Sequence, residues 1–167
     1  LPDESLLAAV LNLEKNQSLV ADGKFIAART DTDEPSLDFF QTLSKIEYTK
    51  PYREVAFPWQ IFSWNGDEIK NDFDLLTGGR QSMPIDETNR VVGRHNIFIE
   101  EGAVVKFSVI NAETGPVYIG TGAEVMENCV IRGPFAMLPG SALKMGAKIY
   151  GPTTLGPVCK VGGEVNN

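Results

Sequence analysis

A single histidine and a few basic side chains are the groups of this chain best suited to acid–base catalysis or phosphate binding. His95 is the one histidine in 167 residues, and imidazole is the side chain that most readily exchanges protons near neutral pH. A surface or capping role is nevertheless the favoured interpretation of His95. The positive charges of Arg132, Lys144, Lys148 and Lys160 could bind a substrate phosphate. We take these four as candidate substrate-binding residues.

Metal binding has less support. One predicted helix carries acidic residues with the spacing of a solvent-facing side: Asp67, Glu68, Asp72 and Asp74. A zinc site of the three-histidine type needs three histidines, and the chain has one. We therefore predict no metal site within these residues.

Net charge and composition exclude several classes of protein. The formal net charge is −7, whereas a nucleic-acid-binding domain carries a basic stripe. No apolar run reaches the ~18–20 residues of a membrane span. Two cysteines are too few for a disulfide scaffold. We expect a globular protein without nucleic-acid or membrane partners, and the cytoplasm is its default location.

Residues 1–90 and 91–167 differ in composition. The first stretch holds 16 of the 22 acidic residues, and the second holds 12 of the 16 glycines. We therefore expect two domains that join near residue 90. Because the chain starts at a leucine and stops within a repeat pattern, we also expect it to be a fragment of a longer protein.

The first stretch has the patterns of an α/β or α+β domain. Asp22-Gly23 between two apolar runs predicts a β-hairpin with a type I′ turn. Apolar periodicity predicts helices that begin near residues 2 and 58, and further helices over 36–46 and 67–76.

Three aromatic residues near the start of the third helix allow two interpretations. They are Trp59, Phe62 and Trp64. We expect them to pack a helix onto a sheet rather than to form a platform for a nucleotide base, because aromatic residues at this spacing are mostly core.

Apolar side chains recur at every sixth position of the second stretch. The series is Ile119, Val125, Ile131, Met137, Leu143, Ile149, Leu155 and Val161. A second series stands two residues before it: Val117, Ala123, Cys129, Phe135, Ser141, Ala147, Thr153 and Cys159. Positions i−2 and i share one face of a strand, so we expect both series to point inward. A period of six is the signature of a parallel β-helix in which three hexads close one coil.

The register of this repeat has two consequences. Ile99 and Val105 belong to an earlier run of the same six-residue repeat. This run is out of step with the series from Ile119 by two residues, so two extra residues must lie within 111–116. Cys129 and Cys159 lie nearly two coils apart, which exceeds the Cα separation of a disulfide. We predict that both are free thiols.

Residues 133–140 carry a resemblance to a known family. They read Gly-Pro-Phe-Ala-Met-Leu-Pro-Gly. This segment, with the small-residue hexad and Gly146-Ala147 after it, resembles the bacterial bifunctional N-acetylglucosamine-1-phosphate uridyltransferase/glucosamine-1-phosphate acetyltransferase family. The closest likeness is to its divergent branch labelled sugar nucleotidyltransferase or glucose-1-phosphate thymidylyltransferase. The resemblance implies that 1–90 is the C-terminal part of a nucleotidyltransferase-like α/β domain. It also implies that 91–167 is a left-handed parallel β-helix of hexapeptide repeats, incomplete at its C-terminal end.

The resemblance also implies a function. It indicates a transferase of sugar-nucleotide biosynthesis, of the UDP-N-acetylglucosamine or dTDP-glucose type, with a sugar 1-phosphate and a nucleoside triphosphate as substrates. It implies a homotrimer, and Mg²⁺ and acetyl-CoA for complete family members, with no cofactor bound within this fragment. The family's nucleotide-binding loop and acetyl-transfer histidine fall outside the chain, so we expect these residues alone to be inactive. Met137 stands where the family has a phosphate-binding arginine, and Gly156 lies near the place of a family lysine.

A non-catalytic role stays open beside this interpretation. A β-helix can serve as a trimerisation or regulatory module without catalysis. Lys144 follows an inward position, so its side chain should point outward. On a trimer it could reach a cleft between neighbouring subunits.

Overall fold

The computed structural model describes residues 2–32 and 36–166. Its internal contacts divide the chain into two units, of which one ends at Ala56 and the other begins at Phe57. The long helix that begins at Trp59 thus belongs with the repeats. The amino-acid composition, in contrast, groups it with residues 1–90. The first strand of the repeats begins at Arg90. Among the described residues no helix is long and apolar enough to cross a membrane.

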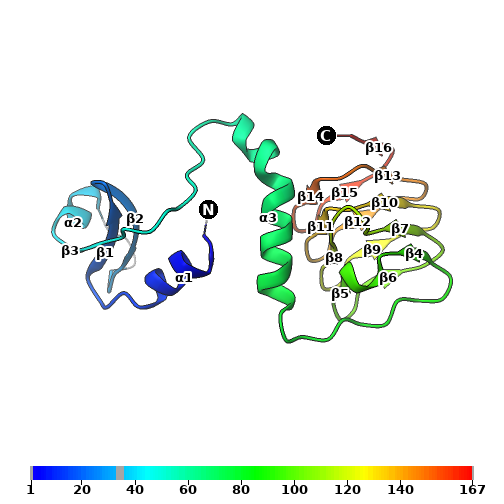
Figure 1. Ribbon diagram of the computed structural model, residues 1–167, viewed down its shortest axis with the longest axis horizontal. Coiled ribbons are helices and arrows are strands. Elements are labelled where there is room, and N and C mark those ends of the chain that lie inside the picture. Colours follow the sequence, from blue (N-terminus) through cyan, green and yellow to red (C-terminus); the bar gives the residue numbers. More distant parts are fainter. Residues whose placement is uncertain (1, 33–35, 167) are drawn as a thin grey trace. The chain divides into compact units, whose positions relative to one another are not determined.

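The first unit is a small α/β unit with a three-stranded sheet (Figure 1). Its elements are α1 (Glu4–Leu11), β1 (Gln17–Ala21), β2 (Lys24–Arg29), α2 (Leu37–Gln41) and β3 (Ser44–Glu47). β1 is central, antiparallel to β2 and parallel to β3. The predicted hairpin is confirmed, since Asp22 and Gly23 connect β1 to β2 with φ angles of 48° and 76°.

The core of this unit lies between α1 and the sheet. Its buried members are Leu6, Leu13, Leu19, Ala21 and Tyr48. The carboxylate of Asp3 accepts a hydrogen bond of 2.8 Å from the backbone N–H of Leu6 and so caps α1. α1 thereby presents its buried leucine to the sheet.

The helix predicted over 36–46 is wrong in its second half. α2 ends at Gln41, where the N–H and the hydroxyl of Thr42 both donate to the carbonyl of Phe39. Four residues of β3 then pair with β1. The apolar periodicity favours a helix here, but the backbone of these residues forms its hydrogen bonds with β1, a strand distant in sequence.

The second unit joins one long helix to a parallel β-helix (Figure 1). α3 (Trp59–Thr77) is continuous, so the two helices predicted on either side of residue 66 are one. Gly66 lies inside it and would ordinarily weaken it. A Cβ at this position would lie 3.1 Å from the ring of Pro152, so the glycine lets the helix approach the solenoid closely.

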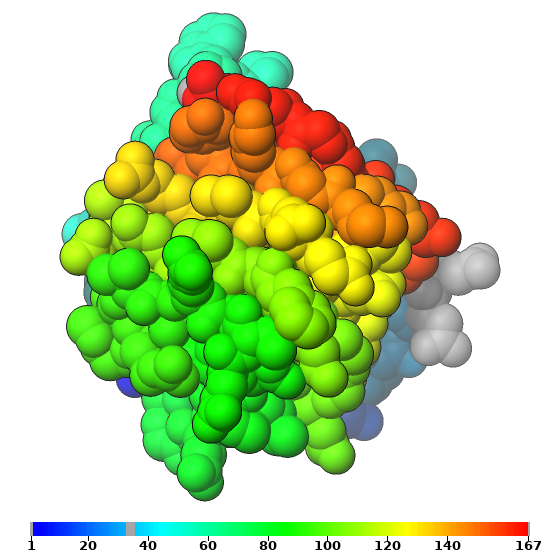
Figure 2. All heavy atoms as spheres, turned by 90° about the vertical axis from the view of Figure 1, so that its right-hand side faces the viewer, coloured from blue at the N-terminus to red at the C-terminus, as the bar shows by residue number. Residues whose placement is uncertain are grey.

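Three parallel sheets form the predicted β-helix and confirm that fold. The first contains β4 (Arg90–Val92), β7 (Val109–Asn111), β10 (Val130–Arg132), β13 (Lys148–Ile149) and β16 (Glu164–Val165). The second contains β5 (Ile97–Ile99), β8 (Val117–Ile119), β11 (Phe135–Met137) and β14 (Thr153–Leu155). The third contains β6 (Val104–Val105), β9 (Glu124–Val125), β12 (Ala142–Leu143) and β15 (Lys160–Val161). Figure 2 shows the successive coils as bands from green to red.

The register of the sheets confirms the displaced repeat. Ile97 pairs with Val117, twenty residues further on, whereas Val117 pairs with Phe135 and Phe135 with Thr153, each eighteen further on. The two extra residues fall in the coil that holds the β7–β8 loop. A Gly-Pro pair recurs at the same eighteen-residue spacing, at 115–116, 133–134 and 151–152. This second period marks the coil length directly.

Both inward series line the core with one exception. Ile119, Ile131 and Leu143 are fully buried. Cys129 is buried as predicted, whereas Cys159 is exposed, so its predicted inward burial is wrong. Within the described chain β15 pairs on one side only, with β12, and no further coil covers this side chain. Both cysteines are free thiols, as predicted.

α3 covers the outer side of the sheet that contains β11 and β14. Its half-buried or buried stripe includes Gly66, Ile69 and Phe73. The Thr154 hydroxyl donates to the side-chain oxygen of Asn65 at 2.7 Å, which brings the helix against the last strand of this sheet.

The predicted packing of the aromatic residues on α3 is wrong for two of the three. Trp59 and Phe62 are 56% and 57% exposed, while Trp64 is half-buried. Asn65 already meets the end strand of the sheet, so the turn before it extends beyond the sheet (Figure 1). Trp59 stacks instead on Phe57, with ring centroids 4.6 Å apart.

One corner of the coils carries a backbone conformation that suits glycine. Gly102, Gly122 and Gly140 occupy this corner in three coils with φ between 64° and 77°. Val158 occupies it in the next coil with a φ of 60°. A β-branched residue in the left-handed region is strained by about 1–2 kcal/mol.

The buried stack predicts the effect of a charge inside it. Ile131→Asp should lower the free energy of unfolding by several kcal/mol, because an unpaired carboxylate would lie in the fully buried core. Val104→Asp is the matched control, since Val104 is 48% exposed. Urea unfolding followed by circular dichroism measures both. A loss within about 1 kcal/mol for Ile131→Asp would contradict the inward assignment.

The strained corner predicts a stabilising change. Val158→Gly should raise the free energy of unfolding by about 0.5–1 kcal/mol, because relief of the left-handed strain exceeds the entropy cost of glycine. Val104→Gly should lower it, since that valine lies in a strand. Thermal unfolding of both variants tests the difference in sign.

Candidate functional site

The four candidate basic residues lie on two different sides of the β-helix. Arg132 and Lys148 are exposed on the neighbouring strands β10 and β13. Lys160 is exposed on β15, and Lys144 follows β12 with its side chain outward, as predicted. The Lys148 ammonium lies 3.7 Å from the carboxylate of Glu164. The four candidates therefore lie on two different sheets rather than on one.

The other groups singled out in the sequence are dispersed. His95 is exposed in a short 3₁₀ turn, Arg94–Asn96, that precedes β5. On α3, burial and the neighbouring Glu68 raise the pKa of Asp72. Within the described residues no group of three or more histidine, cysteine or acidic side chains could hold a metal ion.

A connected polar cluster lies beside the C-terminal end of α3. Glu100 accepts hydrogen bonds from Arg80 at 2.6 Å and from Tyr118 at 2.8 Å. Arg80 also donates to the carbonyl of Leu76 at 2.9 Å and lies over the ring of Phe98. The cluster thus joins the last turn of α3 to the outer side of its sheet.

Electrostatics within this cluster favour the charged carboxylate. The hydrogen bond from Arg80 is the main cause that lowers the pKa of Glu100. Burial is the main cause that raises the pKa of Tyr118 to about 12, so this phenol stays a donor. These shifts suit a structural clamp on α3 better than proton transfer near neutral pH.

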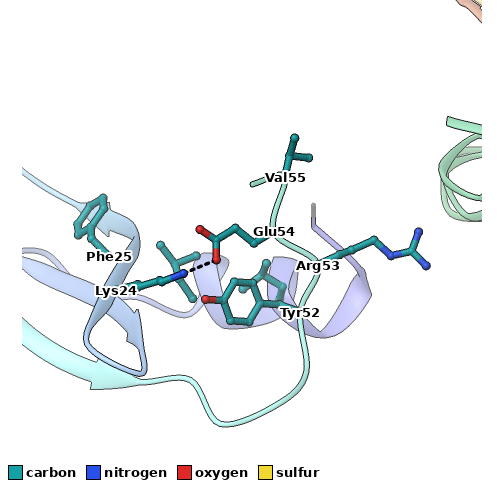
Figure 3. A pocket seen from close by; sticks show the side chains of 8 residues that line it. Lys24, Phe25, Tyr52, Arg53, Glu54 and Val55 are labelled. Carbon is teal, nitrogen blue, oxygen red and sulfur yellow. Dashed lines mark hydrogen bonds and ion pairs between the residues drawn. The ribbon is translucent and has the colours of Figure 1, made fainter. Parts of the chain in front are cut away.

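The first unit contains a surface hollow of about 280 Å³. Its lining comes from α1, from β2 and from the segment after β3, and it consists of Leu6, Lys24, Phe25, Ile26, Tyr52, Arg53, Glu54 and Val55. Figure 3 shows Lys24 and Glu54 pointing toward one another, with Tyr52 beside them. Their ammonium and carboxylate groups are 2.7 Å apart. We call this feature the Lys24–Glu54 hollow.

The ion pair of the hollow remains open to solvent. The side chains of Lys24 and Glu54 are 62% and 48% exposed. The hydrogen bond to Glu54 is the main cause that raises the pKa of Lys24, so this ammonium stays charged at neutral pH. The hollow thus offers ammonium donors and carboxylate acceptors beside aromatic and aliphatic carbon.

No pattern in the sequence predicts this hollow. Lys24 is the first residue of β2, and Glu54 lies thirty residues later in a stretch without helix or strand. No spacing rule connects the two. The fold of β2 beside the 52–55 segment brings them together.

Comparison with protein families matches residues 1–81 to the family described as sugar nucleotidyl transferase. This region is therefore sugar nucleotidyltransferase-like, and it includes every residue of the Lys24–Glu54 hollow. No curated protein and no solved structure matches the chain significantly.

The clamp on α3 predicts a dependence of stability on pH. The folded pKa of Glu100 lies below its unfolded value, so its stabilising effect is complete above an unfolded pKa of about 4.3. It is lost as the pH falls through the folded pKa. Glu100→Gln should therefore cost about 1 kcal/mol at pH 7 and almost nothing at the lowest pH.

Urea unfolding at a series of pH values measures this difference. Glu101→Gln is the control, because Glu101 is an exposed neighbour on the same turn. A cost of Glu100→Gln that is independent of pH would contradict the electrostatic role of the carboxylate.

Proposed function

We propose that the chain is part of a sugar-1-phosphate nucleotidyltransferase that acts in sugar-nucleotide biosynthesis in the cytoplasm. The observation that carries this proposal is the match of residues 1–81 to sugar nucleotidyl transferases, in a chain that continues into a parallel β-helix. The same order occurs in the bifunctional family that residues 133–140 resemble. Products of the UDP-N-acetylglucosamine or dTDP-glucose type follow from that resemblance.

The reaction itself sets strict demands on its site. A phosphate oxygen of the sugar 1-phosphate attacks the α-phosphorus of the nucleoside triphosphate, and pyrophosphate leaves. Enzymes of this kind hold the triphosphate with backbone and basic groups and use Mg²⁺ bound by carboxylates. The described residues hold no group of three or more histidine, cysteine or acidic side chains that could bind a metal ion. We assign substrate binding, rather than catalysis, to these residues.

Acetyl transfer is the second activity that the family resemblance implies. It needs a base beside the attacking sugar amine and a site for acetyl-CoA. His95 is exposed and precedes β5, so we assign it no such role. Arg132 and Lys148 on one side, and Lys144 and Lys160 on the other, remain the candidates for phosphate binding on the β-helix.

A self-associating module is the second candidate function, and exposed apolar residues favour it. They gather where the sheet of β6 turns into the sheet of β7: Phe107, Val109, Val130 and Met145. Each is at least 40% exposed. Val109 and Val130 are paired on adjacent strands. Because α3 covers another sheet, this edge is the side on which we propose that subunits meet, as a trimer.

Two assays test the transferase proposal. Pyrophosphate release with sugar 1-phosphates and nucleoside triphosphates, and thiol release from acetyl-CoA, should both show no turnover by the 167 residues. Calorimetry should show saturable binding of a sugar 1-phosphate. Robust turnover that a point substitution abolishes would contradict the assignment to binding. Absence of binding to any sugar phosphate or nucleotide would contradict the function itself.

The exposed edge predicts a variant that reduces self-association. Phe107→Asp should shift the protein toward the monomer, because it places a charge on the exposed apolar edge. The backbone at Phe107 has a φ of 52°, which aspartate tolerates better than most residues. Leu37→Asp on α2 is the control, since Leu37 is exposed and lies in the other unit. Analytical ultracentrifugation measures the state, and an unchanged distribution would count against this edge.

A further inference from the structure

The Lys24–Glu54 hollow combines features that a sugar ring requires. A pyranose has hydroxyl groups around its rim and C–H groups on its faces. The hollow presents a charged donor and a charged acceptor together with the aliphatic side chains of Leu6 and Ile26. The ring of Tyr52 lies beside the ion pair (Figure 3).

The Tyr52 ring is held in place by its neighbours. It meets the ring of Tyr48 edge to face, with centroids 6.3 Å apart. The Tyr48 hydroxyl lies 2.7 Å from the hydroxyl of Ser5 on α1, and Tyr48 itself is buried. A positioned ring of this kind offers a flat apolar surface at little entropic cost.

The charges around the hollow favour a neutral polar ligand over a phosphate. Glu54 neutralises Lys24 directly, and Asp22 adds a second negative charge near that lysine. The guanidinium of Arg53 points away from the pair (Figure 3). A phosphate bound to Lys24 would therefore face the carboxylate of Glu54. Hydroxyl groups, in contrast, can both donate to Glu54 and accept from Lys24.

The size of the hollow supports the same choice. Its volume of about 280 Å³ lies just below the range of typical ligand pockets, which span about 300–1,000 Å³. A single sugar ring suits this volume better than a complete nucleotide.

We infer that the Lys24–Glu54 hollow binds the hexose ring of the sugar-phosphate substrate, with Lys24 and Glu54 on its hydroxyls and Tyr52 on its face. The inference rests on the proposed function and adds the site and the part of the substrate that it recognises. The phosphate of the same molecule projects out of the hollow.

Calorimetry and NMR titration of the 167-residue chain test this assignment. The probes are glucose 1-phosphate, N-acetylglucosamine 1-phosphate, free glucose and inorganic phosphate. A sugar 1-phosphate should perturb the amide signals of β2 and of residues 52–55, and inorganic phosphate should not. Glu54→Gln and Lys24→Met should each weaken binding on the order of tenfold, because each removes a charged hydrogen-bond partner.

Matched variants separate recognition from folding. Tyr52→Phe should keep binding and Tyr52→Leu should lose it, because only the first retains the ring. Lys45→Met on β3 removes a lysine from the opposite edge strand of the sheet and should leave binding unchanged. Circular dichroism of each variant checks that it is folded.

The outcomes distinguish this inference from the function on which it rests. If the unmodified chain binds no sugar phosphate, both are overturned. If it binds one and the hollow variants bind equally well, the hollow is overturned and the proposed function survives. Competition by inorganic phosphate for the same amide signals would overturn the choice of the sugar ring.

Discussion

The parallel pairing of each coil with the next is the constraint on which the second unit depends. Every backbone hydrogen bond of a sheet joins residues one coil apart, so the side chains at one position of the repeat stack above one another. The inward series that contains Ile119, Ile131 and Leu143 is accordingly apolar in every coil, and these three side chains are completely buried. A charged member of this series would lie against apolar neighbours above and below it.

The corners of the coils follow from the same stacking. One corner turns the chain from the second sheet into the third within a few residues, and glycine repeats there at Gly102, Gly122 and Gly140. Val158 interrupts this column while its backbone keeps the same left-handed conformation. The pairing of neighbouring strands thus imposes the turn even where the side chain resists it.

Buried apolar side chains fill the interior of the coils, so we look for ligand sites on the outer surface and in the first unit. The inside of the coils has no room for a ligand, and one outer side is covered by α3. The hydrogen bonds of Glu100 with Arg80 and Tyr118 hold the end of that helix rather than face a substrate. The Lys24–Glu54 hollow differs, because its charges are open to solvent and flanked by carbon surfaces. These properties make the small first unit the place where we expect sugar recognition.

The β-helix is predictable from the sequence alone. The six-residue period of apolar residues such as Ile131 reflects both the local geometry of each strand and the core that successive coils share. The sequence likewise determined the Asp22-Gly23 hairpin, whose turn needs only two adjacent residues with positive φ. Tertiary structure decided the features that depend on distant partners. Pairing with β1 made residues 44–47 a strand. On α3, Trp59 and Ile69 belong to the same apolar stripe, but only Ile69 is buried, because the sheet of the β-helix ends before it reaches Trp59. The meeting of Lys24 and Glu54 had no sequence signal, because a loop's path across a neighbouring strand is set by long-range packing and not by local periodicity.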